Sequence, residues 1–492
     1  MPFQTRERRR HLRRIAIEAM LTAGIVICAT PAHADDPAPA AASAPGQSST
    51  PNYSTGLPSG RAQLQPAQPA TTQAIDAAPV EHLLDDWGGV QPWLQSRGIN
   101  LQFNALTEFG ANVTGGTQRA SSFASQIGLS NDINWERLAG ITGLSTHVII
   151  VNRSGANVSH SFGDNLLPAQ EIYGSGGNVA FHLVSAYAQE TLYDGRLDVA
   201  LGRMNVENDF ASSPLYCGFM NNALCGDPKA LPGGDIGHSA YPDAAWALRA
   251  RMRPTPDTYI ESGVYEVNQG LYSDANFRTG WKFDSSQDSG VYIPVEAAWL
   301  PRLGPDDLPG HYKLGVGYDT SSTYKDFTNA LATAGVPGYL PQTHTGNFQG
   351  WFLADQMLFR NRPGDDSGLI ALTGLIQNDP NNTQYGRQYI FALLDRGFWD
   401  ARPTDGAGIL YTYVDVSNRL AAVESIEQTL GLPLSNNATG IQSHEAVLEI
   451  NYDIHAYRGV HFQPDFQYVF RPNAQANIHD AAVFGFRARV EF

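Results

Sequence analysis

Apolar and polar residues alternate strictly near the C-terminus of the chain. From Ala482 to Phe492 every second residue is Ala, Phe or Val, and Arg487, Arg489 and Glu491 lie between them. The segments 445–455 and 460–471 show the same period of two. In a strand this period places apolar side chains on one face and charged side chains on the other. The pattern predicts three consecutive strands that share one oily face.

The connections between these strands alternate in length, with a tight turn expected at residues 457–459 and a longer loop at 473–480. Six earlier turn sequences lie at residues 137–140, 194–195, 254–257, 302–310, 361–368 and 401–406. Together these turns divide residues 99–492 into eight hairpins. Short turns at one rim and long loops at the other are typical of outer-membrane barrels. The expected fold is all-β, a sixteen-stranded antiparallel transmembrane β-barrel with a short N-terminal helix.

A soluble β-sandwich also alternates, so the two all-β folds have to be distinguished. Aromatic residues recur near the expected strand ends, as at Trp135, Trp246, Trp299 and Tyr452. This placement is typical of the interfacial girdles of a membrane barrel. The chain also ends on an alternating strand with Phe492, a feature of proteins inserted by the outer-membrane assembly machinery. We therefore favour a barrel in contact with outer-membrane lipid and lipopolysaccharide, with that machinery as a partner.

The first 34 residues have the pattern of a cleaved secretory signal peptide. Six Arg residues precede an apolar run from Ile15 to Ala29, and Ala32 and Ala34 form a small-residue cleavage site. The run is too short to span a bilayer with ease. Export of this kind, followed by barrel insertion, predicts the outer membrane of a Gram-negative cell.

Three segments follow the leader. Residues 35–80 are almost wholly Ala, Pro, Ser, Gln, Thr and Gly, which predicts a disordered linker. Residues 81–98 carry apolar residues at helical spacing, interrupted by Gly88 and Gly89, and predict a short periplasmic helical segment. The barrel domain is expected to occupy residues 99–492.

Two cysteines remain after the leader, Cys217 and Cys225 in the stretch YCGFMNNALCG. An oxidising compartment would let them pair across a short loop. Metal binding is the rival interpretation, but the sequence offers no second Cys pair, and His238 is the only histidine nearby. We expect a disulfide and no metal site.

The charge and the motifs narrow the classes of function. The formal net charge is −16, which disfavours a nucleic-acid partner. The sequence contains no Gly-rich phosphate loop, nucleophile elbow or zinc motif, so we expect neither an enzyme nor a cofactor.

Five stretches of sequence carry a family resemblance. They are LLDDWGGVQPWLQSRGI, YDGRLDVALGRMNVENDF, YCGFMNNALCG with the pair Tyr241 and Pro242, EAVLEINYDIHAYRGVHFQPDFQYVFRPN, and the terminal FGFRARVEF. In this order, from Leu83 to Phe492, the chain resembles the OprB-type carbohydrate-selective porins. The resemblance implies a sixteen-stranded pore that loops narrow from inside, and passive diffusion of glucose and related sugars. A general diffusion porin and a secreted sugar-binding β-protein are the alternatives.

A ladder of arginines is the first candidate for the pore wall. Arg249, Arg251 and Arg253 alternate with Leu248, Ala250 and Met252. Such a face cannot point at lipid, because each guanidinium would cost about 2–4 kcal/mol at mid-depth. We therefore expect the three arginines to line the lumen and to contact sugar hydroxyl groups.

Charged residues of the last strands are the second candidate. We expect Glu445, Glu449 and Asp465 to face the arginine ladder across the pore and to create a transverse field. The alternative is that these charges pair with one another and only keep the lumen wet. The same two interpretations apply to Arg487 and Arg489.

Loops supply the remaining candidates. The segment 208–241 follows the fifth expected strand, where porins commonly fold a loop into the barrel to set its narrowest diameter. Trp281, in a later loop, is a candidate for stacking on a sugar ring, with simple packing as the alternative.

Overall fold

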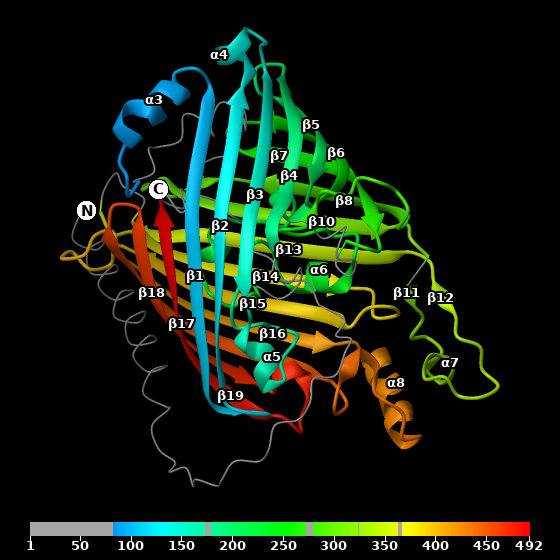
Figure 1. Cartoon of the computed structure of the whole chain (residues 1–492). Coiled ribbons are helices and arrows are strands. Elements are labelled where there is room, and N and C mark those ends of the chain that lie inside the picture. The colour runs from blue at the N-terminus through cyan, green and yellow to red at the C-terminus, as the bar shows by residue number, and fades with distance from the viewer. Residues whose placement is uncertain (1–81, 173–178, 272–278, 323, 363–366) are drawn as a thin grey trace. The chain divides into compact units, whose positions relative to one another are not determined.

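The computed structural model describes residues 82–172, 179–271, 279–322, 324–362 and 367–492 (Figure 1). The predicted leader at 1–34 and linker at 35–80 lie outside these ranges. Within the described ranges, no helix is long and apolar enough to cross a membrane.

Sixteen strands of the described chain close into one antiparallel barrel, which confirms the predicted fold. β1 pairs with β2 along one edge and with β19 along the other, so the first and last strands meet (Figure 1). The barrel strands are β1 (Ile99–Gly116), β2 (Ala120–Asn134), β3 (Leu144–Gly155), β4 (Val179–Leu192), β5 (Leu197–Met204), β6 (Ala245–Thr255), β7 (Thr258–Asn268), β8 (Asp288–Trp299), β10 (Leu308–Asp319), β13 (Asn347–Arg360), β14 (Gly368–Asn378), β15 (Tyr385–Arg396), β16 (Gly406–Val416), β17 (His444–Tyr457), β18 (Val460–Phe470) and β19 (His479–Glu491).

Three short strands stand apart from the barrel wall. The two-residue β9 (Arg302–Leu303) pairs only with the start of β10, although it belongs to the same hydrogen-bonded sheet. β11 (Tyr324–Lys325) and β12 (Thr343–His344) form a separate two-stranded sheet in the long connection from β10 to β13.

The tight connections lie where the turn sequences predicted them. They link β2–β3, β4–β5, β6–β7, β8–β10, β13–β14, β15–β16 and β17–β18. Gly140 and Gly195 adopt φ angles of 74° and 85°, a left-handed backbone that glycine reaches without steric cost. The connections at the opposite rim are mostly longer, and the longest runs from residue 205 to residue 244. By the general rule for outer-membrane barrels, the tight turns mark the periplasmic rim.

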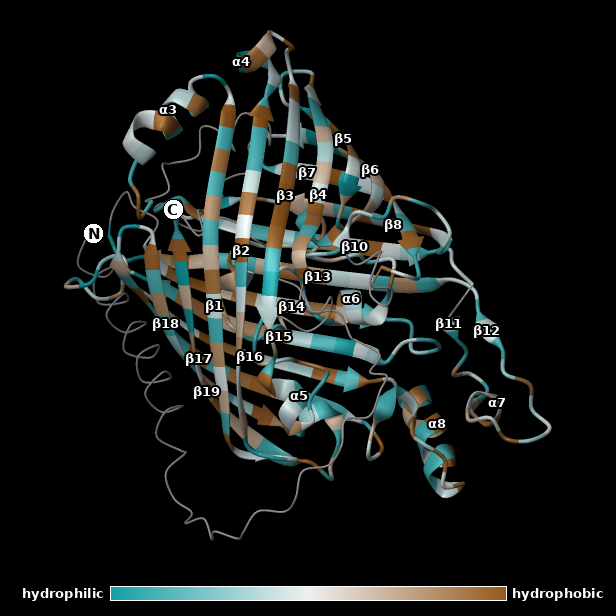
Figure 2. Ribbon diagram, in the orientation of Figure 1, coloured by the Kyte–Doolittle hydropathy of each residue, from teal (hydrophilic) through white to brown (hydrophobic). Residues whose placement is uncertain are grey.

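Hydrophilic and hydrophobic residues alternate along many of the strands (Figure 2), and buried and exposed residues alternate with them, as along β6 and β13. Large apolar side chains that point outward remain exposed, and they belong to strands all around the barrel: Ile127, Leu201, Leu248, Val264, Val316, Phe352, Leu375, Phe391, Phe462 and Phe484. Their exposure on a closed barrel is what a lipid-facing surface requires.

The described helices are short, and they lie before β1 or in the connections between barrel strands. They comprise η1 (Trp87–Gly89), α3 (Val90–Gln95), α4 (Trp135–Ala139), α5 (Val158–Phe162), η2 (Val206–Asn208), η3 (Tyr216–Gly218), α6 (Ala230–Gly234), α7 (Ala330–Thr333), α8 (Asn418–Thr429), η5 (Ser435–Asn437) and η6 (Pro472–Ala474). Within 81–98 the helical residues form η1 and α3, and the chain is irregular where they meet, because Gly88 and Gly89 take positive φ angles of 66° and 90°. The backbone N–H of Leu83 donates to the carbonyl of Glu491 at 2.8 Å, which ties this segment to the last strand.

Candidate functional site

The connection between β5 and β6, residues 205–244, contacts the inner face of the barrel and is called the inserted segment below. Its large apolar side chains are buried, including Phe210, Leu215, Phe219, Leu224 and Leu231. They belong to one hydrophobic cluster with inward-facing residues of β13–β16, called the apolar wall: Trp351, Leu353, Ile370, Leu372, Ile376, Ile390, Leu394, Leu410 and Val414. Burial of each such side chain contributes about 1.5–3 kcal/mol. The apolar wall therefore holds the inserted segment as a core would.

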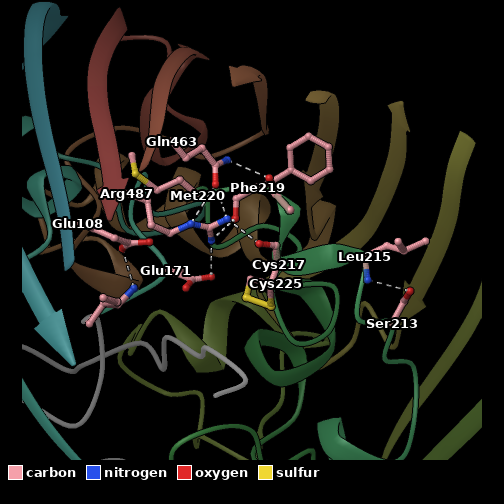
Figure 3. Close-up of a disulfide and its surroundings, with 12 residues drawn as sticks. Glu108, Glu171, Ser213, Leu215, Cys217, Phe219, Met220, Cys225, Gln463 and Arg487 are labelled. Atoms are coloured by element: carbon pink, nitrogen blue, oxygen red, sulfur yellow. Dashed lines mark hydrogen bonds and ion pairs between the residues drawn. A yellow bond between two sulfur atoms is a disulfide. The ribbon is translucent and has the colours of Figure 1, made fainter. Parts of the chain in front are cut away.

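A disulfide lies within the inserted segment (Figure 3). Cys217 and Cys225 are bonded with an S–S distance of 2.02 Å. A carboxylate oxygen of Glu171 and both sulfur atoms lie within 4.8 Å of one another. Because the two sulfurs are bonded to each other, they provide no thiolate ligands, and this group is not a metal site.

Arg487 of β19, three strands along the barrel from β16, also anchors the inserted segment (Figure 3). Its guanidinium donates to the carbonyls of Phe219 at 3.1 Å and Cys217 at 2.6 Å. It also lies 3.3 Å from a carboxylate oxygen of Glu171. The side chain points into the barrel and is buried against the inserted segment, and its contact with permeating solute stays a prediction. The guanidinium donates hydrogen bonds to backbone carbonyl groups of the irregular segment, which need partners because they are buried or partly buried.

The three acids expected to face the arginine ladder are also covered. Glu449 accepts the backbone N–H groups of Met220 at 2.6 Å and Asn221 at 3.0 Å. Asp465 accepts from Gln467 at 2.8 Å, and Glu445 is fully buried. These acids therefore contact the inserted segment rather than open solvent, and the transverse field expected from them stays a prediction. A carboxylate is a strong acceptor for unpaired backbone amides, and the inserted segment supplies them.

The three arginines of the ladder point into the barrel. They belong to a group of charged inward-facing residues on β5–β8 and β10, which we call the charged wall: Asp198, Arg249, Arg251, Arg253, Glu261, Glu296 and Lys313. Arg249 lies 3.0 Å from Asp209 of the inserted segment, and Arg251 lies 2.7 Å from Glu261. Arg253 pairs with Asp198. The arginines are thus matched by neighbouring acids, and Arg249 and Arg253 are buried. The side chain of Arg251 keeps 16% of its surface exposed and so remains available to solute.

Several charged or aromatic side chains on the inner face remain partly exposed, and we call them the solvated belt. Its members are Asp132, Tyr187, Asp209, Arg251, His311, Lys313, Asp453, His461 and Arg489. Apart from Asp209 in the inserted segment, they lie toward the tight-turn ends of their strands. The belt is the part of the inner surface where polar groups and water meet.

The belt combines the two contacts that sugars use. The ring of Tyr187 stacks on His147 with centroids 4.7 Å apart, and His147 is fixed by Asp132 at 2.7 Å. Such a ring can pack against the apolar face of a sugar. Arg251 and Asp209, 3.7 Å apart, offer a donor and an acceptor for hydroxyl groups. Contacts of this kind are individually weak, as release from a channel requires.

Arg489 is the one predicted arginine of the last strand that keeps this partial exposure. Its Nη2 lies 3.7 Å from Asp453, which also contacts His461 at 3.1 Å. The residues of the belt that sequence reasoning missed include Asp453, His461 and Tyr187. The period of two places Asp453 and His461 on the inner face, but only the three-dimensional position of the inserted segment shows which inward residues stay exposed.

Trp281 packs against the exposed Phe181 of β4, and its role in sugar stacking stays a prediction. Its ring stacks on Phe181 with centroids 5.5 Å apart, and its Nε1 donates to the Phe181 carbonyl at 3.1 Å. Phe181 is exposed, and its neighbour His182 points inward, where it lies buried 3.5 Å from Asp243. The alternative interpretation of simple packing fits this loop tryptophan.

Comparisons with known proteins agree with this architecture. The model of the OprB family, described as carbohydrate-selective porin, matches residues 118–492. Porin B of Pseudomonas aeruginosa is 27% identical over 435 residues, which is 83% of this chain and 91% of the relative.

Two solved structures are similar in fold. The high-pH structure of Pseudomonas putida OprB has a TM-score of 0.76 and 24% identity, and the match covers 85% of this chain and 99% of that chain. The low-pH structure of the same protein has a TM-score of 0.51 and 18% identity, with 84% and 100% covered. At these identities the two structures show a common fold and no more.

Proposed function

The chain belongs to the OprB family of carbohydrate-selective porins, and on that premise we propose that glucose and related sugars diffuse through it along the solvated belt. The protein is a channel of the Gram-negative outer membrane rather than an enzyme. The observation that carries the proposal is the contrast in exposure on the inner face. The apolar wall is covered by the inserted segment, whereas Arg251, Asp209 and Tyr187 keep contact with solvent.

Diffusion along the belt would proceed by exchange of weak contacts. A sugar hydroxyl can accept from Arg251 and donate to Asp209, and the next hydroxyl can replace it as the molecule advances. Tyr187 would guide the ring plane. Because the acids and bases of the belt are paired with one another, the site favours a neutral polyhydroxyl solute over either ion.

The test is sugar block of the ion current in planar bilayers. We expect glucose to reduce the current of the parent protein saturably. Asp209→Asn should weaken that block about fivefold, since it removes one charge-assisted acceptor worth about 1 kcal/mol. Asp307→Asn is the matched control, because Asp307 also pairs with an arginine, Arg302 at 3.2 Å, but lies exposed at a turn.

Each outcome of this measurement decides between the alternatives. A parent current that ignores glucose would reject carbohydrate-specific passage and favour a general diffusion porin. If the parent is blocked and Asp209→Asn is blocked equally, Asp209 is not part of the sugar path. A protein absent from the outer-membrane fraction would instead favour a secreted sugar-binding β-protein.

We also propose that the exposed outer face contacts lipid and lipopolysaccharide, and that the strand ending at Phe492 is read by the outer-membrane assembly machinery. The outward apolar side chains support the first proposal. The backbone N–H of Phe492 donates to the carbonyl of Phe103 at 2.9 Å, so the terminal residue lies at the junction of last and first strands. N-terminal sequencing of the exported protein would test cleavage after Ala34.

A further inference from the structure

The inserted segment, the barrel wall and a long external connection meet at one buried joint. The connection between β10 and β13 carries residues 324–344, which we call the external arm. Asp235 comes from the inserted segment directly after α6, Asp319 is the last residue of β10, and Tyr324 begins the external arm. Asp235 and Asp319 are 2% and 0% exposed.

Three oxygen atoms of this joint lie in a row at hydrogen-bond distances. The hydroxyl of Tyr324 is 2.7 Å from Oδ1 of Asp235 and 2.5 Å from Oδ2 of Asp319. A phenol carries one proton and can donate to only one of the two carboxyl groups. The second short contact therefore needs another proton, held by Asp235 or Asp319.

Backbone amides fix both carboxyl groups in place. The N–H of Gly237 donates to Oδ1 of Asp235 at 2.8 Å, and the N–H of Ser321 donates to Oδ1 of Asp319 at 2.6 Å. The joint cannot relax simply by rotating one carboxyl group away without losing these bonds. Distances of 2.5–2.7 Å are typical of short O–H···O bonds that involve a charged oxygen.

Other titratable groups lie near the joint, but none of those described below forms an ion pair with Asp235 or Asp319. His238 of the inserted segment lies 2.6 Å from Asp227 and 3.0 Å from the hydroxyl of Tyr292 on β8, so its ring is committed to those partners. Among the described residues, no Lys or Arg forms an ion pair with Asp235 or Asp319. Burial, and then the neighbouring Asp319 carboxylate, raise the pKa of Asp235 well above its usual value.

The external arm brings its own charges near the joint. Lys325 and Asp326 follow Tyr324, and Lys325 is exposed. His344 pairs with Tyr324 in the two-stranded sheet of the arm and lies 3.9 Å from Asp379. These groups lie on the arm or at its base, so a test must separate their titration from that of the joint.

We propose that this joint is a proton-operated latch, in which a proton shared among Asp235, Asp319 and Tyr324 holds the external arm against the inserted segment and its loss releases the arm. The latched state binds one proton more than the released state. Latching is therefore complete at low pH and is lost as the pH rises through the pKa of the joint. Above that value the ratio of released to latched molecules should rise about tenfold per pH unit.

The inserted segment itself should stay in place when the arm is released. Its other anchors are carboxylates that accept backbone N–H groups, such as Glu449 with Met220 and Glu296 with Ala211 at 2.8 Å. Those contacts need no additional proton. The latch thus acts on the external arm, and it is independent of the sugar path proposed above.

Hydrogen–deuterium exchange of residues 324–344 tests the latch in the folded full-length protein. After correction for the intrinsic pH dependence of exchange, protection of the wild-type arm should fall about tenfold per pH unit above the pKa of the joint. Asp319→Asn should abolish this dependence, because its amide can donate to Tyr324 at every pH while Oδ1 still accepts from Ser321. Tyr324→Phe should leave the arm unprotected at all pH values.

Asp326→Asn is the matched control, since it makes the same change of charge two residues after Tyr324 and should keep the wild-type profile. A wild-type arm whose protection ignores pH would overturn the proposal. So would an Asp319→Asn variant that keeps the wild-type dependence, which would assign the effect to His238 or His344. If Asp319→Asn does not fold, Asp235→Asn replaces it with the same expectation.

Discussion

The apolar wall and the charged wall are built from the same alternation but serve opposite purposes. Inward positions of β13–β16 are mostly apolar and are buried against the inserted segment. Inward positions of β6–β8 carry charges paired with neighbours, and some of them keep contact with solvent. One part of the inner face is therefore a protein core, and the other carries charged side chains that belong in part to the proposed sugar path. Not every inward-facing residue of the barrel lines open space, and a charged inward-facing residue can be as deeply buried as an apolar one.

The largest expected effect comes from a cavity in the apolar wall. Leu410 is fully buried on β16, and Leu410→Ala should lower the free energy of unfolding by about 2–5 kcal/mol through lost transfer energy and the hole left behind. Leu314→Ala is the control, because Leu314 points outward from β10 and is exposed. Thermal unfolding in detergent, followed by gel mobility, would measure both. Equal effects would contradict the distinction between core and surface.

Removal of the disulfide should have an intermediate effect. The loop closed by Cys217 and Cys225 lies between the apolar wall, where Gly218 packs near Leu394, and the guanidinium of Arg487. Cys217→Ser with Cys225→Ser should cost about 2–3 kcal/mol by the loop-entropy model. Noise in single-channel current should increase if the loop loosens. An unchanged unfolding temperature would mean that the two walls hold the segment without this cross-link.

Substitution of a residue of the solvated belt should have the smallest effect on stability and a separate effect on transport. Arg489 forms a partly exposed pair with Asp453, so Arg489→Gln should change stability by less than about 1 kcal/mol. Loss of this cation should move ion preference toward cations. Reversal potentials in a salt gradient would measure the shift. Arg302→Gln, at an exposed turn, is the control and should leave the potential unchanged.

The sequence predicted the barrel more fully than the site, for a physical reason. A period of two along β19 and the tight turns are local signals, and they predicted strands and connections correctly. The partners of Glu449 and Arg487 lie 229 and 270 residues away, in an irregular segment with no period. Trp281 illustrates the same limit, since a loop aromatic carries no signal of which face it covers.

The anchor that the inserted segment has on the last strand also has a consequence for the order of assembly. Arg487 belongs to the last strand, which pairs with the first strand and completes the wall. Contacts between residues so distant in sequence form late, because the intervening chain must first be ordered. The segment at 205–244 therefore acquires its final anchor only when the cylinder closes. We expect barrel closure and narrowing of the lumen to occur in the same kinetic step. A partly assembled barrel would therefore have a lumen that the inserted segment does not yet narrow.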